Sequence, residues 1–164
     1  MIRSPQLTKS KGAAFLLAQV GAHAAATFAD RLSPLDLTPA HAGLLRMIAV
    51  SAGASQQEIA DKLRMFPSRL VGLIDQLQER GLVERGPHPD DRRTHALRLT
   101  ADGQRTIEAI GKIGREHQDA LLAALTKQER ETLASLLLRV ASQQGLTPGV
   151  HPGYARMRPA SGDK

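Results

Sequence analysis

Cysteine is absent from this sequence of 164 residues, and its absence excludes several kinds of chemistry. Disulfide bonds, thiolate metal sites and cysteine-based redox sensing all require thiols, so none of them is available to this chain. The sequence also lacks an apolar run of about 18 residues, the length that predicts a membrane-spanning helix. The first apolar stretch is interrupted by Gln19 and His23, so we expect a folded helix there rather than a signal peptide, and a cytoplasmic protein.

Aromatic residues are scarce, because the sequence has three Phe, one Tyr and no Trp. Proteins that bind single-stranded nucleic acid usually stack the bases on aromatic side chains. The net charge of +6 favours a polyanionic partner, with nucleic acid ahead of a membrane surface. Charge alone does not distinguish such a protein from a merely basic one. Taken together, the two features favour duplex DNA, held through helices and phosphate contacts.

Signals of catalysis and of metal binding are also missing. The sequence shows no pairing of a nucleophile with a base and no phosphate-binding loop, and its serine-containing stretches are explained as helix caps. The six histidines include no close pair of the H-x-x-x-H kind, so a zinc site lacks its usual spacing. We therefore expect neither an enzyme nor a bound metal or other cofactor.

The order of helix signals predicts a mainly helical fold. Apolar residues recur at helical spacing through residues 10–32. Thr38 followed by Pro39 marks the start of a second helix. Ser55 and Glu58 have the Ser-x-x-Glu spacing of a capping box, which opens a third helix.

A fourth helix and a small hairpin follow. Pro67 opens the helix, and Gly81 ends it. A short strand-like segment then leads into a loop that is marked by glycine and proline. Residues 94–99 alternate, which predicts a second strand with Leu97 on one face and Ala96 on the other.

Two further helices complete the pattern. Thr100 caps a long helix, and Thr126 with Glu129 forms a second capping box that opens the last one. The fold that we expect is mainly α with a small β hairpin. Residues 55–103 form a winged helix-turn-helix reading module, flanked by N- and C-terminal dimerisation helices.

The outer helices, at about residues 10–32 and 102–144, are too apolar to stand alone in water. Pairing with a second copy would bury that surface, and a two-fold dimer would place two reading helices about one DNA turn apart. The alternative is that these helices pack only on their own chain. We expect one domain over residues 10–144 and a mobile C-terminal tail, rich in proline and glycine, over residues 145–164.

The N-terminal half of the fourth helix is the expected base-reading surface. Its outward positions form a small or polar face that lets the backbone approach the base edges: Ser68, Arg69, Val71 and Gly72. Arg69 suits a guanine edge or a phosphate, and Ser68 with the N–H groups at the helix start suits a phosphate. The alternative for Arg69 is a solvated surface arginine.

Further contacts are expected around this helix. Gln56 and Gln57 begin the preceding helix, where they either meet the DNA backbone or serve as ordinary first-turn residues. Lys62 and Arg64 lie near the turn between the two helices, and we expect one of them to hold a phosphate.

The tip of the hairpin carries Asp90, Asp91, Arg92 and Arg93. Two arginines suit the narrow and negative minor groove. Because the aspartates would repel DNA, we expect Asp91 to pair with an arginine of the wing or of the reading helix. The other arginine is then available for DNA.

Three phrases in residues 67–103 together resemble the MarR family of bacterial transcriptional regulators. A reading helix ends in a leucine–acid–arginine–glycine–leucine–valine–x–arginine phrase, a D-x-R-R wing follows, and L-T-x-x-G opens the next helix. These residues are Leu77, Glu79, Arg80, Gly81, Leu82, Val83 and Arg85; Asp90, Asp91, Arg92 and Arg93; and Leu99, Thr100 and Gly103. The wing phrase is the specific part, and the resemblance extends over roughly residues 10–144.

The resemblance implies an obligate homodimer whose winged helix-turn-helix binds a pseudo-palindromic operator. It also implies repression, often relieved by a small and commonly phenolic molecule between the DNA-binding and dimer regions. Residues 68–73 fall on the base-reading helix of the family, and Arg92 and Arg93 fall on its wing. The peroxide-sensing branch of the family uses cysteines, so this chain lies outside that branch.

Two residues depart from the family pattern. Phe66 stands in the turn where the family usually has a small or hydroxyl helix cap. This weakens the cap and predicts a buried apolar anchor instead. Gly72 has no side chain, so it leaves fewer groups on the base-reading face of the helix.

Three histidines fall on helices that line the effector cavity of the family, and aromatic, apolar and basic residues are expected beside them. The candidates are His23, His41 and His117, with Phe15, Phe28, Met47 and Arg46 as neighbours. A histidine there suits a phenol or a carboxylate, and the alternative for each is a partly buried residue whose hydrogen bonds are satisfied within the protein. His88 and His95 belong to the wing, where we expect them to touch phosphate or nothing.

The expected function is sequence-specific transcriptional regulation through double-stranded DNA, as a repressor released by a small effector, often a phenol or an aromatic acid. The alternative is an architectural protein that binds duplex DNA with little regard to sequence. Symmetric half-sites upstream of its own gene would favour the regulator. Binding spread uniformly along the DNA, with an affinity that falls steeply as salt rises, would favour the architectural protein.

Overall fold

The structure is a computed structural model that describes residues 12–151. Its elements are α1 (Ala13–Leu32), the 3-10 turn η1 (Ser33–Leu35), α2 (Pro39–Val50), α3 (Gln56–Leu63), α4 (Pro67–Glu79), β1 (Val83–Pro87), β2 (His95–Leu99), α5 (Ala101–Leu121) and α6 (Lys127–Gln143). This order confirms the mainly helical class with one small hairpin. Residues 10–11 of the first predicted helix and 152–164 of the predicted tail lie outside the described residues.

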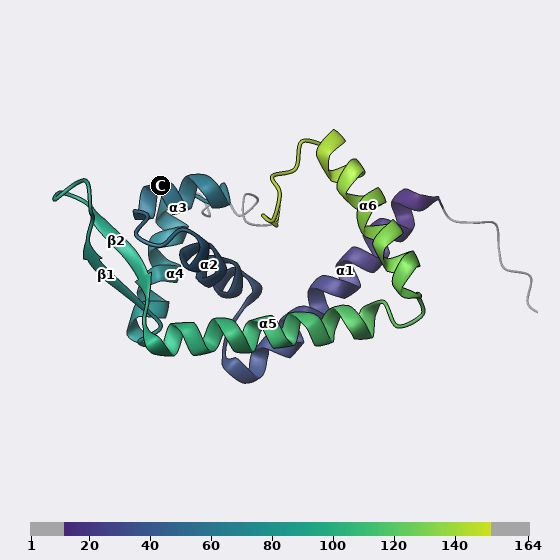
Figure 1. The fold of residues 1–164 in the computed structure, drawn as a ribbon, viewed down its shortest axis with the longest axis horizontal. Coiled ribbons are helices and arrows are strands. Elements are labelled where there is room, and N and C mark those ends of the chain that lie inside the picture. Colours follow the sequence, from purple (N-terminus) through teal and green to yellow (C-terminus); the bar gives the residue numbers. More distant parts are fainter. Residues whose placement is uncertain (1–11, 152–164) are drawn as a thin grey trace, which may run out of the picture.

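The long helix α5 joins two regions of the molecule (Figure 1). At one end, α2, α3, α4 and the β1–β2 hairpin gather into a single lobe. From the foot of the hairpin, α5 runs to the opposite end, where α6 and the start of α1 lie, and α1 packs along α5. The expected reading module and the expected dimerisation helices therefore occupy separate parts of the fold.

Side chains three residues apart fix the starts of α3 and α6. The hydroxyls of Ser55 and Thr126 accept hydrogen bonds from the backbone N–H groups of Glu58 and Glu129. In return, each glutamate carboxylate accepts the backbone N–H of its capping residue at 2.7 Å. Both capping boxes were predicted from the sequence and are confirmed.

The start of α2 uses a histidine where a capping box usually has an acid or an amide. The Thr38 hydroxyl accepts the His41 N–H at 3.3 Å, and His41 Nδ1 accepts the Thr38 N–H at 3.2 Å. The second ring nitrogen, Nε2, lies 2.7 Å from Oε1 of Gln76 on α4. Because His41 is only 9% exposed, this ring joins α2 to the reading helix from inside the protein.

A close backbone approach locks the start of α5 against the end of α4. Gly81 has a φ of +69°, the left-handed conformation that ends a helix. The Thr100 hydroxyl donates to the Gly81 carbonyl at 2.6 Å, and the Thr100 N–H donates to the Leu82 carbonyl at 3.1 Å. At Gly103, a Cβ atom would collide with the Leu82 carbonyl oxygen. The L-T-x-x-G phrase therefore encodes a cap and a close contact in the same turn.

Both edges of β2 are paired. β1 and β2 are antiparallel, with Val83 opposite Leu99. On the other edge, Ser55 bridges Ala96, and the Leu97 N–H donates at 2.9 Å to the carbonyl of the residue before Ser55. The segment before α3 thus acts as a short third strand, which ties the wing to the helix-turn-helix.

The burial of β2 departs from simple alternation. Ala96 and Leu97 are both 0% exposed, although they lie on opposite faces of the strand. The simple alternation predicted from the sequence would cover only one face. It does not hold here, because both faces of β2 are covered at this point and Ala96 is as fully buried as Leu97.

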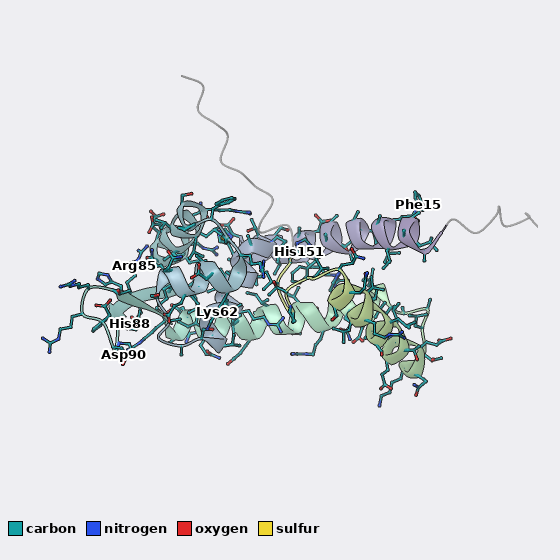
Figure 2. All side chains as sticks on the ribbon, turned by 90° about the horizontal axis from the view of Figure 1, so that it is seen from above. Phe15, Lys62, Arg85, His88, Asp90 and His151 are labelled. Atoms are coloured by element: carbon teal, nitrogen blue, oxygen red, sulfur yellow. The ribbon has the colours of Figure 1, made fainter. Side chains whose placement is uncertain are left out.

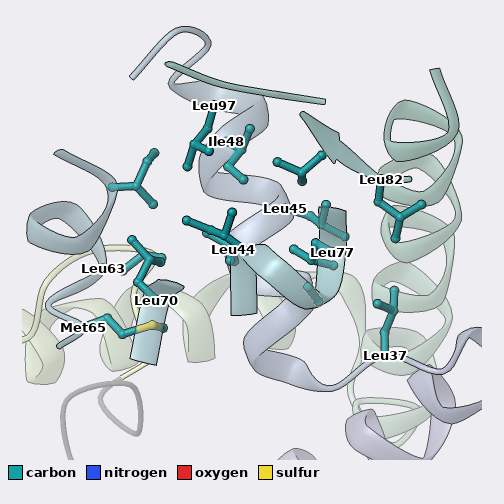
Figure 3. Packing of buried hydrophobic residues seen from close by; sticks show 14 of the residues in the cluster. Leu37, Leu44, Leu45, Ile48, Leu63, Met65, Leu70, Leu77, Leu82 and Leu97 are labelled. Atoms are coloured by element: carbon teal, nitrogen blue, oxygen red, sulfur yellow. The ribbon is translucent and has the colours of Figure 1, made fainter. Parts of the chain in front are cut away.

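Aliphatic side chains from α2, α3, α4 and the hairpin meet in one core (Figure 3). Its fully buried large members are Leu32, Leu44, Leu45, Ile48, Ile59, Leu63, Leu70, Ile74, Leu77, Val83 and Leu97. Burial of each side chain of this size contributes roughly 1.5–3 kcal/mol. The reading helix and its wing are therefore held as one packed unit.

The apolar stripes of α1 and α6 behave differently. Eight of their large apolar side chains are between 38% and 67% exposed: Phe15, Leu16, Leu17 and Val20 on α1, and Leu136, Leu137, Leu138 and Val140 on α6. No residue of α6 is buried in the described chain. Within residues 12–151, no helix has the length and apolarity needed to cross a membrane.

Candidate nucleic-acid interface

A hollow of about 340 Å³ lies where the starts of α3 and α4 meet the wing. Residues from three separate segments line it: Gln56 and Gln57 of α3; Pro67, Leu70 and Val71 of α4; and Arg93, Thr94 and His95 of the wing and β2. The structure thereby brings together Gln56, Gln57, Val71 and Arg93, four of the residues predicted to contact DNA.

The other predicted contacts surround this hollow but do not line it. Ser68 and Gly72 are exposed on the first two turns of α4, and Arg69 is half-buried there. Arg92 is exposed at the wing tip. Arg64 is exposed at the C-cap of α3 with a φ of +50°, a conformation that few residues other than glycine adopt.

Phe66 is the N-cap residue of α4, and it forms no side-chain cap hydrogen bond within the described chain. The predicted weak cap is therefore present. The predicted burial of Phe66 is wrong, because its side chain is 42% exposed. Met65 takes the buried position in the turn, at 4% exposure, so the apolar anchor lies one residue earlier than expected.

Arg85 of β1 joins three elements, a role that was not predicted from the sequence. Its Nε donates to Oε1 of Gln56 at 2.8 Å, and its Nη2 donates to Oδ1 of Asp75 at 2.7 Å. Its Nη1 also donates to Oε1 of Gln78. These contacts connect the wing to the start of α3 and to the reading helix. An arginine that follows a leucine–valine phrase was the available sequence signal.

The wing loop is ordered by Asp91, but through partners other than those expected. Its Oδ1 accepts the backbone N–H of Arg93 at 2.9 Å, and its Oδ2 accepts the Thr94 hydroxyl at 2.8 Å. These two hydrogen bonds, aided by the nearby His88, lower the pKa of the Asp91 carboxyl below its ordinary value. No guanidinium pairs with Asp91 among residues 12–151, so the expected arginine pair is wrong. A backbone amide meets the aspartate because it lies two residues away.

His88 lies inside the base of the wing, contrary to the expectation that it touches phosphate or nothing. Its side chain is 14% exposed, and Nε2 lies 3.7 Å from Oε2 of Glu58. Its Nδ1 accepts the Asp90 N–H at 3.2 Å. The pKa of Glu58 is lowered, first by hydrogen bonds from the Ser55 backbone and hydroxyl and then by His88. Figure 2 shows Arg85, His88 and Asp90 together at the wing end of the molecule.

Of the two basic residues near the turn, Lys62 already has an internal partner. Its Nζ donates to the Ser51 hydroxyl at 2.9 Å. Gln57 likewise donates to Oδ1 of Asp61 at 2.9 Å, although its side chain stays exposed at the hollow. Arg64 forms no such hydrogen bond or ion pair within the described chain, so it is the better placed of the two for a phosphate.

Only some of the residues predicted to line an effector site lie close together. The rings of Phe28 and His117 lie 5.4 Å apart and are tilted by 44°. Met47 on α2 is half-buried against the core. Phe15 lies 13 residues before Phe28 on α1, about 20 Å along the helix. Both ring nitrogens of His41 form hydrogen bonds within the protein. His41 is therefore a buried residue with internal partners, the alternative to an effector contact.

The environment of His117 favours its neutral form. Burial lowers the pKa of the ring below its ordinary value, and the positive charges of Arg31 and His23 lower it further. His117, His23, Arg31 and Phe28 therefore form a small cluster between α1 and α5. Among the described residues, no three histidine or acidic side chains are placed to hold a metal ion.

The helix-turn-helix formed by α3 and α4, with a hairpin beside it, defines a winged helix-turn-helix protein. The model of the MarR family matches residues 35–94. The proposed transcriptional regulatory protein for the hcr operon of Thauera aromatica is 36% identical over 113 residues, which cover 68% of this chain and 68% of that protein. The multiple antibiotic resistance protein MarR of Escherichia coli is 34% identical over 112 residues, which cover 68% of this chain and 78% of that protein. The chain belongs to the MarR family of DNA-binding transcriptional regulators, which are not enzymes.

Solved structures agree in fold. Wild-type apo MarR from E. coli superposes with a TM-score of 0.71 at 29% identity, covering 81% of this chain and 98% of that one. A mutant of the same protein in complex with operator DNA superposes with a TM-score of 0.68 at 30% identity, covering 77% and 91%. The winged helix-turn-helix and the outer helices therefore share the architecture of these regulators.

Proposed function

We propose that this protein is a sequence-specific repressor that binds a pseudo-palindromic operator in double-stranded DNA as a homodimer in the cytoplasm. The observation that carries the proposal is the hollow at the exposed start of α4, where Gln56, Gln57, Val71 and Arg93 converge from three segments. The operator complex of the related E. coli MarR supports duplex DNA as the partner. The net charge of +6 supports it as well.

The first two turns of α4 enter the major groove. Arg69 reads a guanine edge or holds a phosphate. The start of α4 has no side-chain cap in the described chain, and the Arg69 N–H already donates to the Phe66 carbonyl, so the backbone N–H and the hydroxyl of Ser68 are the groups that we assign to a phosphate. Arg64, at the end of α3, holds the phosphate backbone beside them.

The wing supplies the remaining contacts. Arg93 lines the hollow, and Arg92 projects from the same loop. One of these arginines enters the minor groove, whose negative potential attracts guanidinium groups. Gln56 is both a phosphate contact and a support, because it lines the hollow and its Oε1 accepts the Arg85 hydrogen bond at 2.8 Å.

Dimerisation covers the apolar faces of α1 and α6. Eight large apolar side chains on these helices stay 38% or more exposed in the single chain, so packing on their own chain leaves them in water. A two-fold pairing over residues 10–144 would bury them and place the two reading helices on one face of the DNA. We assign no DNA-reading role to the C-terminal segment 145–164.

The cluster of Phe28 and His117 is the proposed effector site. A small aromatic acid would stack on the Phe28 ring and direct its carboxylate to Arg31, with a hydrogen bond to the neutral His117 ring. The cluster lies between α1 and α5, and α5 is the helix that leads from the reading lobe to the outer end of the molecule (Figure 1). A ligand there would change the spacing of the two reading helices and release the operator. His23, Met47 and Phe15 remain secondary neighbours of this site.

The test is a footprint of the full-length protein on the DNA upstream of its own gene, followed by affinity measurements on the protected site and on a scrambled duplex. A regulator protects symmetric half-sites and binds the site more tightly than the scrambled DNA by a factor of roughly 10³ or more. Uniform protection with a steep salt slope would instead show the architectural alternative.

Two matched variants separate specific contacts from general charge. Arg69→Ala should cost roughly 1–3 kcal/mol on the operator. Lys127→Ala removes the same charge at the opposite end of the molecule, where Lys127 is 93% exposed, and should leave operator binding unchanged. A thermal-shift screen of small aromatic acids, each hit tested for DNA release, examines the effector separately.

A further inference from the structure

Two large apolar side chains lie exposed at the start of the reading helix. Phe66 is 42% exposed and Val71 is 38% exposed. Apart from α1, α6 and the segment after α6, the described chain exposes only one other large apolar side chain, Val50. Val71 lies in the wall of the hollow together with Gln56 and Arg93, so it faces the same space as the polar residues that are proposed to meet DNA.

No contact within the described chain explains why residue 72, which follows Val71, is a glycine. It lies in the interior of α4, where glycine destabilises the helix relative to alanine. Its backbone does not have a positive φ, and a Cβ atom at this position would meet no atom within 4 Å. Neither a turn nor internal packing therefore requires glycine here. A glycine on an open helix face suits the close approach of an external group to the backbone.

The four outward positions of α4 divide into two chemical pairs. Ser68 and Arg69 carry hydrogen-bonding groups, whereas Val71 and Gly72 carry none. A valine side chain cannot read the donors and acceptors of a base edge, and it leaves them without partners if it covers them. In the major groove, the one apolar group that any base presents is the 5-methyl group of thymine.

We propose that Val71 reads thymine by packing on its 5-methyl group, and that Gly72 lets the reading helix come close enough for this contact. The inference rests on the proposed function, because it assumes that α4 enters the major groove. It adds a specificity: each half-site contains an A·T pair opposite Val71, recognised by apolar contact without a hydrogen bond from the protein at that position.

The test begins with the best duplex that the full-length protein selects from a random pool. Each thymine of that duplex is then replaced in turn by deoxyuridine, which removes one methyl group and keeps the base pair and the phosphates. We expect one thymine in each half-site to be sensitive, with affinity falling about fourfold per methyl group and roughly 15-fold when both are removed.

Val71→Ala identifies the residue that makes the contact. On the thymine duplex, this variant should lose about the same factor as the deoxyuridine replacement, and on the deoxyuridine duplex it should lose nothing further. Val50→Ala makes the same change on an exposed valine outside α1, α4 and α6 and should bind both duplexes as the unaltered protein does. Independent and additive losses from Val71→Ala and from deoxyuridine would overturn the assignment.

Gly72→Ala tests the close approach with two readouts. We expect its thermal midpoint to rise, because alanine favours the helix, and its affinity for the selected duplex to fall. A variant that is more stable and binds equally well would overturn the role of Gly72. If every deoxyuridine duplex binds as tightly as the thymine duplex, the proposed recognition of thymine by Val71 is wrong, but the proposed function as a regulator is not contradicted. If no duplex is selected over random DNA, the proposed function itself fails.

Discussion

Arg85 and Asp75 form an ion pair with 2.7 Å between Nη2 and Oδ1, and this pair joins the wing to the reading helix. Asp75 lies on α4, in the turn that follows the N-terminal residues that are proposed to enter the groove. The same guanidinium reaches Gln56 at the start of α3. One side chain therefore sets the angle between three elements that must act on DNA together.

We expect Arg85→Ala to weaken operator binding more than it weakens the fold. The arginine side chain is 24% exposed and Asp75 is 51% exposed, so solvent screens the pair and its loss should cost only about 1 kcal/mol of unfolding free energy. The variant should also lose the contact that the wing makes with DNA. The slope of log affinity against log salt concentration should therefore fall by about 1, the value expected for one lost phosphate contact. Urea unfolding and DNA titrations at several salt concentrations measure the two effects.

Arg85→Lys is the matched control for this prediction. Lysine keeps the charge but cannot make the three divergent contacts of the guanidinium. It should therefore behave like Arg85→Ala in DNA binding. Full affinity in the lysine variant would show that charge alone matters and that the wing is oriented by other contacts.

Asp91→Ala should loosen the wing and weaken DNA binding, even though it removes a negative charge from a DNA-facing loop. The carboxylate holds the Arg93 N–H and the Thr94 hydroxyl, and its lowered pKa shows that the charged form is favoured in the folded state. This stabilisation is present above the ordinary carboxyl pKa of 3.8 and is lost as pH falls through the lowered value. Amide hydrogen exchange of Arg93 reports the loosening directly.

The adjacent Asp90→Ala removes the same charge without the loop contacts of Asp91. It should strengthen DNA binding slightly, because only electrostatic repulsion is lost. If Asp91→Ala also strengthens binding, the aspartate has no ordering role, and the hydrogen bonds to Arg93 and Thr94 do not matter for the interface.

Gly103→Ala should destabilise the fold by roughly 1–3 kcal/mol. The added Cβ collides with the Leu82 carbonyl, which is backbone and cannot move aside without displacing the end of α4. Gly114→Ala in the same helix is the comparison, since a Cβ there meets no atom within 4 Å. That variant should gain stability by about 0.5–1 kcal/mol. Equal midpoints in urea for both variants would contradict the proposed close contact.

Stability should decline in mild acid because of His117. Burial first, and then Arg31 and His23, lower the pKa of the folded ring below its ordinary value of 6.5. Below about pH 6.5 the unfolded chain therefore binds a proton that the folded chain resists, and the free energy of unfolding falls as pH decreases. Unfolding in urea at pH 7.5 and 5.5 measures the loss, which His117→Gln should reduce.

The elements that the sequence predicted well depend on residues close together in the chain. The capping boxes of α3 and α6 each close between residues three apart, and the proline at the start of α4 and the glycine after its end act on their own backbone. Such signals survive in any tertiary setting, because both partners are always neighbours. The helix order and the position of the hairpin followed from them.

The partners of individual side chains were predicted less well, because they depend on packing. Asp91 was assigned an arginine side chain but meets a backbone N–H and a hydroxyl. Phe66 was expected to be buried, but Met65 fills the core. His41 was a candidate effector contact, but it joins α2 to α4 through Gln76, which lies 35 residues away.

The sequence by itself determined the class of this protein, the order of its helices and the residues that the start of α4 presents outward. These follow from local hydrogen bonds and from the spacing of apolar residues, which act before distant segments meet. Only the tertiary structure decided that Arg85 holds the wing to the reading helix, that β2 is paired on both edges, and that Val71 and Arg93 share one hollow. Those relationships arise when residues 10 or more positions apart are brought together by a common core, and no local pattern encodes which of them will meet.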